Sequence, residues 1–331
     1  MLYRTIAESE KYQHSERLAL CQYRIFLISI GDDQNQNLRA AAQFECYIDR
    51  LDEAIELDAI KDLADVYLSL RDWNRLDLLA DKMTIKAQAH YHFTHHSSKK
   101  NSLTLKTKRP LFLYIIYGYL LRSVVCEERE DYQQALYYVS LYSDLDWVDD
   151  TSEEALKIIA QYKELALTNT YLYQLMMGNL EVLPLYLACI ATQEDEVLPA
   201  LSKIIHASKR YDFEIEPILE SFHNYVMHLD LQQMISGTTS KQVRADRYAY
   251  FLTELASFYF DKGMYNEGIK SILDGLTVAI QISSESEVIK CVGLFEKYRH
   301  TASSDAQHRY QNLISEICHH YENKEYVSVS H

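Results

Sequence analysis

The scarcity of glycine and proline is the feature of this sequence that most constrains its fold. Among 331 residues there are only 8 Gly and 4 Pro, well below the average usage of about 7% and 5%. A β-sandwich, a barrel or a doubly wound sheet needs many tight turns. Those turns depend on residues that adopt positive φ or hold φ fixed. Because this chain has so few of them, we expect an all-α protein.

Composition and charge exclude several other classes. A hydrophobic share of 48% is normal for a folded protein and argues against disorder. A formal net charge of −15 opposes binding to nucleic-acid phosphates and to anionic membranes. The chain has no run of 18 apolar residues, and its first residues carry charges where a signal peptide is apolar. We therefore expect a soluble, cytoplasmic protein that does not contact a membrane.

Apolar residues recur with helical periodicity along nearly the whole chain. Helices are predicted at residues 16–29, 36–49, 56–70, 74–95, 111–129, 132–144, 152–177, 180–192, 195–209, 214–229, 242–262, 266–282, 285–299 and 305–323. The short connections place consecutive helices antiparallel. We expect one continuous array in four segments: N-terminal repeats at 1–97, a basic loop at 98–110, C-terminal repeats at 111–325 and a tail at 326–331.

Three helix junctions share a pattern that suggests an internal repeat. Each has a small residue, then a short polar turn, then an aromatic residue. The small residues are Ala64, Ser123 and Ala256, and the aromatic residues are Trp73, Tyr132 and Tyr265. Small residues allow two helices to approach closely, and the aromatic residue can wedge between neighbouring hairpins. These junctions resemble the tetratricopeptide repeat, whose helix pairs stack into a right-handed superhelix. The alternative is a helical-hairpin array without true repeats.

The resemblance extends to a regulatory family. Residues 108–128 (KRPLFLYIIYGYLLRSVVCEE), 131–148 and 176–201 are similar to the tetratricopeptide sensor domain of the bacterial peptide-pheromone regulators, the Rap, NprR and PlcR group. The resemblance implies a concave groove that binds a short peptide and thereby controls an output domain or partner. Nothing in residues 1–60 has the pattern of a helix-turn-helix. We therefore expect this chain alone not to bind DNA, its DNA-binding part being lost or encoded separately.

The register of the tetratricopeptide family implies which side chains line such a groove. Counted from Ala64 they are Asp58, Lys61, Asp65, Leu68 and Ser69; from Ser123 they are Tyr117, Leu120, Val124, Glu127 and Glu128; from Ala256 they are Tyr250, Thr253, Ser257, Phe260 and Asp261. Asn169 and Tyr173 join them from the helix predicted at 152–177, because an Asn amide can both donate to and accept from a peptide backbone. The mixture of aromatic, acidic and hydroxyl groups suits an extended peptide with a basic side chain.

The function predicted from these residues is a peptide-sensing module linked to transcriptional regulation. The alternative is a constitutive protein–protein interaction scaffold whose groove binds no small ligand. A homodimer is compatible with either. No Gly-rich phosphate loop, G-x-S-x-G or H-E-x-x-H motif is present, so we expect neither an enzyme nor a cofactor.

Three further features have a structural and a functional interpretation. Residues 97–110 hold five basic residues and no acidic one; we favour a solvated loop over a docking arm for an acidic partner. His92 and His96 have the i,i+4 spacing of a metal site, but without a nearby carboxylate or thiol we predict no metal. The six cysteines, Cys21, Cys46, Cys126, Cys189, Cys291 and Cys318, are expected to be reduced and packed in helices.

Overall fold

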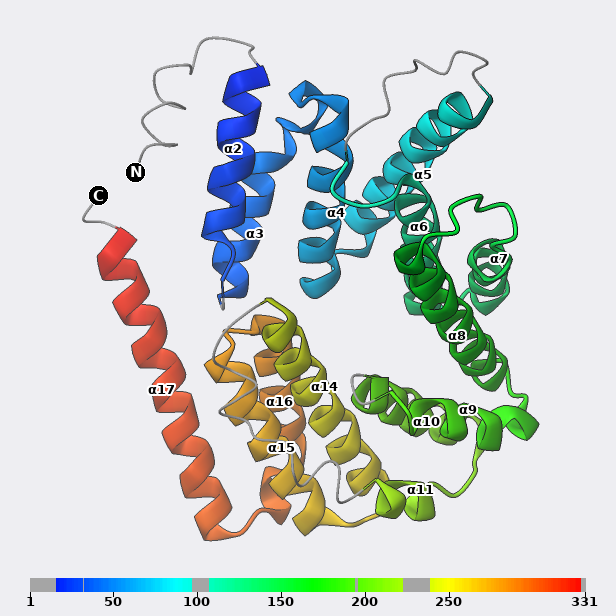
Figure 1. The fold of residues 1–331 in the computed structure, drawn as a ribbon. Coiled ribbons are helices and arrows are strands. Elements are labelled where there is room, and N and C mark those ends of the chain that lie inside the picture. Colours follow the sequence, from blue (N-terminus) through cyan, green and yellow to red (C-terminus); the bar gives the residue numbers. More distant parts are fainter. Residues whose placement is uncertain (1–15, 32, 97–106, 194–195, 223–238, 329–331) are drawn as a thin grey trace. The chain divides into compact units, whose positions relative to one another are not determined.

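A computed structural model describes residues 16–31, 33–96, 107–193, 196–222 and 239–328 of the chain (Figure 1). Every regular element within these ranges is a helix. The all-α prediction is therefore confirmed for the described part of the chain. Many consecutive helices pack against each other, as short connections favour. No helix in the described ranges is long and apolar enough to cross a membrane.

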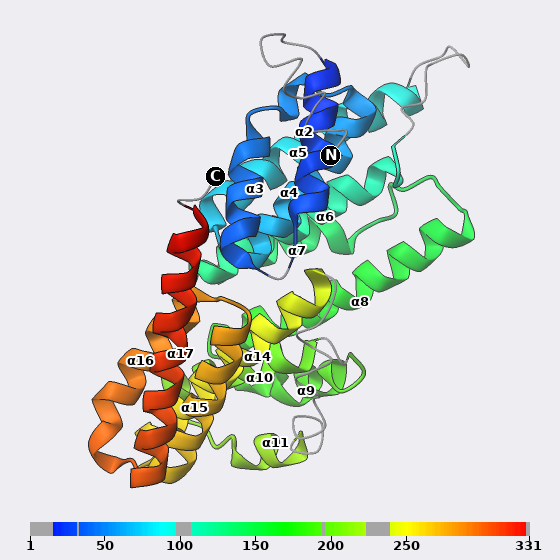
Figure 2. The ribbon, with the colours of Figure 1, turned by 90° about the vertical axis from the view of Figure 1, so that its left-hand side faces the viewer.

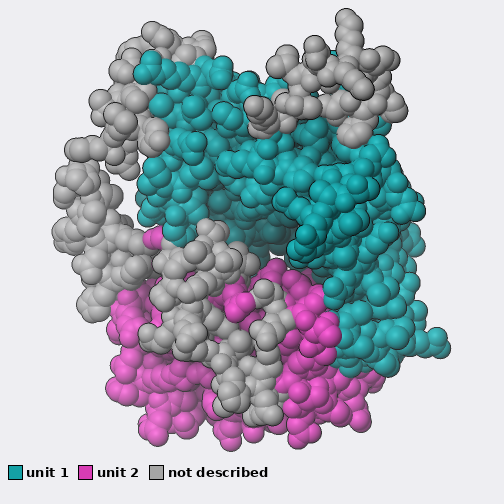
Figure 3. Space-filling model, viewed as in Figure 1, with its two compact units in different colours: residues 1–31, 35–189 teal, residues 32–34, 190–331 magenta. Residues whose placement is uncertain are grey.

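The chain divides into two compact units, which Figure 3 distinguishes by colour. Unit 1 comprises the described parts of residues 1–31 and 35–189, and unit 2 those of residues 32–34 and 190–331. The composition of the sequence showed no break near residue 190. The described part of the basic stretch, residues 107–110, belongs to unit 1.

Unit 1 is built mainly of long helices joined by short turns (Figure 1). Its helices are α2 (Glu16–Ser29), α3 (Gln34–Glu45), α4 (Glu53–Ser69), α5 (Trp73–His96), α6 (Leu111–Glu128), α7 (Tyr132–Ser143), α8 (Glu153–Met176) and α9 (Leu183–Ile190), with 3-10 turns η1 (Ile48–Arg50) and η2 (Leu180–Val182). Helices α4 to α8 pack in sequence, each against the next. Leu57, Ile60 and Leu63 of α4 lie fully buried in the core of this unit.

The three aligned junctions end their first helix with the same backbone turn. In each, the residue two positions before the aromatic is left-handed: Arg71 at φ 55°, Glu130 at φ 56° and Gly263 at φ 73°. The next amide then donates to the carbonyl five residues back, as the Asp72 amide does to Tyr67 at 3.0 Å. This pattern is the Schellman motif, which satisfies carbonyls that a helix end leaves unpaired. Only the last of the three junctions uses the glycine that this conformation favours.

Two of these junctions use a single aspartate to end one helix and begin the next. The Asp131 amide donates to the Cys126 carbonyl at 2.9 Å, while its carboxylate accepts from the Gln134 amide at 3.0 Å and caps α7. Asp72 has the same role before α5, where its carboxylate accepts from the Arg75 amide at 3.2 Å. An aspartate in this position both fits the turn and satisfies a free N–H of the following helix. This explains why such short connections suffice.

Helices α5 and α6 approach closely at Gly118. A Cβ atom placed there would lie 2.0 Å from the Thr84 hydroxyl and 2.9 Å from the Ala80 carbonyl. Both distances are too short for any side chain, so only glycine permits this crossing. The sequence pattern had singled out Ser123 as the close-contact position on this helix. Ser123 is buried, and the close approach at Gly118 lies five residues earlier.

Unit 2 contains the C-terminal helices. These are α10 (Val197–Tyr211), α11 (Glu216–Ser221), α14 (Thr239–Asp261), α15 (Tyr265–Gln281), α16 (Glu285–Tyr298) and α17 (Ser304–Ser328), with the 3-10 turn η4 (Arg299–Thr301). Helix α15 packs against α14, α16 and α17, and Figure 2 shows α17 running beside it. The helix predicted at 214–229 corresponds to α11, and its residues after 222 lie outside the described ranges.

Stacked aromatic rings organise the core of unit 2. The rings of Phe260 and Tyr298 lie 4.0 Å apart and nearly parallel, and those of Phe295 and Tyr310 lie 3.9 Å apart. Gly268 makes room for the first pair, because a Cβ there would lie 2.6 Å from the Phe260 ring. Such rings bury a large apolar area with a defined geometry.

Candidate functional site

A row of charged side chains on α4 forms the most distinctive polar surface of unit 1. Asp58, Lys61, Asp62 and Asp65 follow one another at spacings of three, one and three residues. On a helix of 3.6 residues per turn, this places all four on one face. The opposite side of the helix is apolar and buried in the core, at Leu57, Ile60 and Leu63 among others. We refer to Asp58, Asp62 and Asp65 as the acidic α4 face.

Each carboxylate of the acidic α4 face accepts a hydrogen bond from a tyrosine on another helix. One tyrosine comes from α2 and two come from α6. The pairs are Tyr114–Asp58 at 2.7 Å, Tyr23–Asp62 at 2.6 Å and Tyr117–Asp65 at 2.5 Å. Hydrogen bonds to an ionised acceptor are shorter and stronger than those between neutral groups. The three pairs therefore fix the positions of the carboxylates and tie α4 to α2 and α6.

The tyrosines of these pairs remain neutral donors over the whole physiological range. Burial is the main cause that raises the pKa of Tyr23, Tyr114 and Tyr117 above the ordinary value, and the adjoining carboxylates raise the pKa further. A phenol that keeps its proton adds no negative charge of its own, and it does not neutralise the carboxylate that it contacts. The face thus remains negatively charged while its geometry is held.

Exposure varies along the acidic α4 face. The Asp58 side chain is only 4% exposed, whereas that of Asp65 is 36% exposed. The Lys61 ammonium donates to Asp65 at 2.8 Å and lies 4.5 Å from the centre of the Tyr117 ring. Asp62 is half-buried. Asp62 and Asp65 are therefore the carboxylates that solvent, or a bound molecule, can reach.

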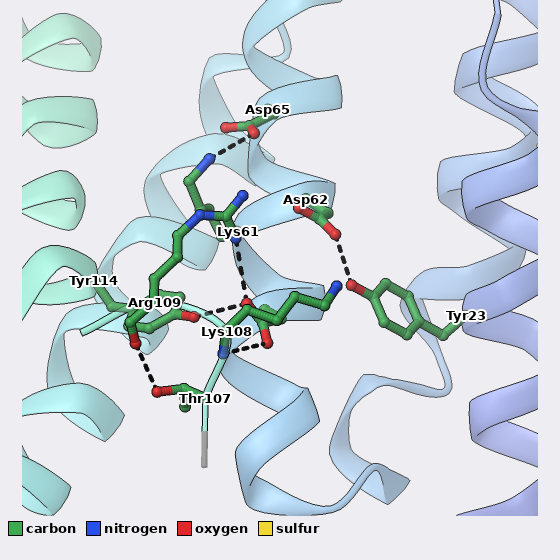
Figure 4. A network of polar contacts seen from close by, with 9 residues as sticks. Tyr23, Lys61, Asp62, Asp65, Thr107, Lys108, Arg109 and Tyr114 are labelled. Atoms are coloured by element: carbon green, nitrogen blue, oxygen red, sulfur yellow. Dashed lines mark hydrogen bonds and ion pairs between the residues drawn. The ribbon is translucent and has the colours of Figure 1, made fainter. Parts of the chain in front are cut away.

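The chain's own residues Thr107–Pro110 lie against this face (Figure 4). The Arg109 guanidinium donates to Asp58 at 3.2 Å, and the Lys108 backbone amide donates to the other oxygen of Asp58 at 3.2 Å. The Lys108 ammonium lies 5.7 Å from the centre of the Tyr23 ring. The Thr107 hydroxyl donates to the Arg109 carbonyl at 2.6 Å and closes the turn. This part of the expected solvated loop is therefore docked, which corrects the prediction for residues 107–110; residues 97–106 lie outside the described ranges.

Five of the predicted groove residues of unit 1, on α6 and α8, have different surroundings. Tyr117 donates to Asp65 of the acidic α4 face, as described above. Asn169 donates to the Tyr142 hydroxyl at 2.8 Å, and Glu128 is exposed. Tyr173 and Glu127 are buried and 3.4 Å apart. A ligand could contact the last two only by displacing their neighbours.

The five residues counted from Ala256 lie in unit 2 on α14. Thr253 is buried and donates to the Ala249 carbonyl at 3.0 Å, and Phe260 belongs to the aromatic core described above. The Lys209 ammonium donates to Ser257 at 2.8 Å and lies 3.6 Å from the exposed Asp261. Tyr250 is half-buried with the Lys290 ammonium 5.2 Å from its ring centre.

Sequence reasoning found part of the acidic α4 face and missed the rest. The register from Ala64 named Asp58, Lys61 and Asp65. It did not name Asp62, although Asp58 and Asp62 have the i,i+4 spacing of neighbours on a helix. Tyr23 and Arg109 reach the face from elsewhere in the chain, and no local pattern of the sequence identifies such partners.

In the described part of the chain, the histidines and cysteines form no comparable cluster. Among the described residues, no group of three or more His, Cys, Asp or Glu side chains is arranged to hold a metal ion. His90 lies 3.8 Å from Glu53, and the side chains of His95 and His96 lie outside the described part. All six cysteines are free thiols; Cys46 and Cys318 are exposed, so the prediction that every cysteine is packed was wrong for these two.

Comparison with known proteins adds no further evidence for a function. No protein-family model, curated protein or solved structure shows a significant match to this chain.

Proposed function

We propose that this protein is a regulatory module that binds a short basic peptide at the acidic α4 face. The observation that carries the proposal is the docking of Thr107–Pro110, a short peptide segment, through both a side chain and a backbone amide. This is how a protein recognises an extended peptide: backbone contacts position it and a charged side chain selects it. The tyrosine hydroxyls around the carboxylates supply a rigid amphipathic frame.

The charge of the molecule favours the same class of ligand. A net charge of −15 attracts cationic peptides over distances of about 10 Å at moderate ionic strength. Asp62 and Asp65 are partly exposed, so they can exchange water for a ligand's ammonium or guanidinium group. A carboxylate that a tyrosine already holds in place loses little freedom on binding, which reduces the cost of association.

The remaining parts of the proposal come from the resemblance to tetratricopeptide sensor domains. We propose that the hairpins stack as a right-handed superhelix of tetratricopeptide type in the cytoplasm, and that peptide binding controls a separate transcriptional output. The sequential packing of α4 to α8 and the shared Schellman turns support the repeat arrangement. Asn169, on α8, would be a further contact for the peptide backbone.

The test is a calorimetric titration of the whole chain with a panel of synthetic heptapeptides that carry zero, one or two arginines. We expect arginine-containing members to bind and neutral members not to bind. The variant Asp62→Asn/Asp65→Asn should lower the affinity at least ten-fold, because it removes both accessible charges of the face. Asp146→Asn/Glu153→Gln is the matched control: it removes two exposed charges elsewhere in unit 1. If no peptide binds, or if both double variants bind alike, the proposed function is wrong.

A constitutive scaffold is the second candidate function. The observation that favours it is a set of exposed apolar side chains on α5, at Leu78, Ile85 and Phe93. Exposed apolar surface on a soluble protein often contacts another protein. A scaffold of this kind requires no affinity for short peptides, so the same titration separates the two functions.

A further inference from the structure

We infer that Arg109 is a built-in competitor: it occupies the place of a basic ligand side chain and must leave Asp58 when a peptide binds. This inference rests on the proposed function. It specifies a ligand with two basic side chains, and it proposes that competition by Arg109 sets the ligand's apparent affinity. The evidence for it is that a segment of the chain itself docks on the acidic α4 face. The acidic residues alone would not be sufficient evidence. Arg109 donates to Asp58 from the segment that precedes α6, and Figure 4 shows Arg109 beside Thr107 and Lys108 of that segment.

The hydrogen bond between Arg109 and Asp58 has a geometry that a competing ligand could replace. A single guanidinium nitrogen donates to the carboxylate, at 3.2 Å, whereas the strongest arginine–carboxylate pairs are bidentate and shorter. The Arg109 side chain is 35% exposed, so solvent reaches it in the free protein. A ligand guanidinium that approaches in bidentate geometry would bind Asp58 more strongly than Arg109 does.

Asp58 itself stays in place during such an exchange. The buried Tyr114 hydroxyl donates at 2.7 Å to the same Asp58 oxygen that accepts from Arg109. This bond comes from α6 rather than from residues 107–110. When Arg109 leaves, the buried carboxylate therefore keeps one strong donor while it accepts the ligand. Tyr114 acts as a positioning residue for the site.

The spacing along α4 indicates which peptide fits. Asp58 and Asp65 are seven residues apart, which corresponds to a rise of about 10 Å along a helix. Three residues of a peptide in the polyproline II conformation span about 9 Å, and its three residues per turn bring side chains i and i+3 to the same side. A ligand with basic side chains at positions i and i+3 would place one near Asp58 and the other near Asp62 and Asp65. Lys61 competes for Asp65 in the free protein, as Arg109 does for Asp58.

Tethering makes Arg109 an effective competitor. A group attached through a short segment acts at an effective concentration of about millimolar, and occupancy of the site by that group lowers the apparent affinity of any ligand. Removing the guanidinium should therefore strengthen binding, the opposite of the effect expected for an ordinary structural arginine.

The experiment titrates the whole chain with acetyl-Arg-Ala-Ala-Arg-amide at low salt. We expect Arg109→Gln to bind this probe at least five-fold more tightly than the wild-type chain. Arg129→Gln is the matched control: it removes an arginine of unit 1 that pairs with Asp77 on α5, away from this face, and should bind as the wild type does. Adding Asp58→Asn to Arg109→Gln should abolish the gain. Equal or weaker binding by Arg109→Gln would overturn the inference.

A second measurement needs no variant. Hydrogen exchange of the Lys108 amide, which donates to Asp58, should become faster when the wild-type chain is saturated with the probe. Unchanged or slower exchange at saturation would overturn the inference even if Arg109→Gln did not fold. The two proposals fail differently. If the wild type binds arginine peptides through Asp62 and Asp65 but Arg109→Gln gains nothing, only the competitor inference is wrong. If no arginine peptide binds any variant, the proposed function is wrong as well.

Discussion

The Tyr114 hydroxyl lies 2.7 Å from the Asp58 carboxylate and joins α6 to α4. Both side chains are buried, so this is an interior hydrogen bond to a charged group. The pair positions Asp58 for its contact with Arg109, and it contributes to the stability of unit 1.

Tyr114→Phe should therefore destabilise the protein. Loss of the hydroxyl leaves a buried carboxylate with one donor fewer, and a hydrogen bond to a charged group is worth about 1.5–3 kcal/mol. Urea denaturation of the whole chain measures this change. Tyr137→Phe is the control, because the Tyr137 ring is exposed and its loss of a hydroxyl should have almost no effect. A Tyr114→Phe variant as stable as the control would contradict the assigned role.

Substitution of alanine for Gly263 and for Gly293 should change the stability of the protein in opposite directions. A Cβ at Gly263 or at Gly293 would have no atom within 4 Å, so neither substitution causes a clash. Gly263 has φ 73° in the turn before α15, and alanine there should cost about 1–2 kcal/mol because left-handed backbone disfavours a side chain. Gly293 lies within α16, where alanine should stabilise by up to about 1 kcal/mol. Thermal unfolding of the two variants checks the signs; a shift of the same sign in both would refute this account of the turn.

Glu296 should make the stability of unit 2 depend on pH in the acid range. Two hydrogen bonds from the Arg299 guanidinium, at 2.7 and 2.6 Å, and a further one from Tyr310 lower the pKa of Glu296 to about 2. Because the folded-state pKa lies below the unfolded value of about 4.3, the stabilisation is present above that value. It is lost as the pH falls toward 2.

The measurement compares the urea midpoint of the wild type and Glu296→Gln between pH 7 and pH 2.5. The wild type should be the more stable at pH 7, and the difference should shrink as the pH falls. The Glu296 side chain is 46% exposed, so we expect a modest effect that 0.5 M salt weakens. Arg299→Gln should show the same loss of stability at pH 7 and the same dependence on pH. A difference between wild type and Glu296→Gln that stays constant with pH would show that the pair does not act in this way.

The cysteines should differ strongly in reactivity. Burial raises the pKa of Cys291 to about 11, although a hydrogen bond with Thr253 opposes this shift. Because the thiolate is the reactive form, Cys291 should resist iodoacetamide at pH 8, while the exposed Cys46 and Cys318 are alkylated. Mass spectrometry of timed samples measures each site, and denaturant should make the rates similar. Alkylation of native Cys291 as fast as that of Cys46 would contradict its burial.

Local features of the sequence predicted the helices because helix formation depends mainly on contacts within a few residues. The periodicity of 16–29 and 111–129 closely matches α2 and α6. The register also placed Asp58, Lys61 and Asp65 on a common face, since the position of a residue around a helix follows from its number alone. The turns at Arg71 and Glu130 were recognised as turns, but not as left-handed, because neither residue is a glycine.

Only the tertiary structure decided which side chains meet across helices. The sequence by itself determined an all-α chain with charged residues along one face of α4. It did not determine that Asp62 pairs with Tyr23, that Phe260 is buried against Tyr298, or that Arg109 docks on Asp58. Those contacts join residues that are 39, 38 and 51 positions apart. Contacts over such separations depend on how whole helices pack, and packing is set by the combined fit of many side chains rather than by any local pattern.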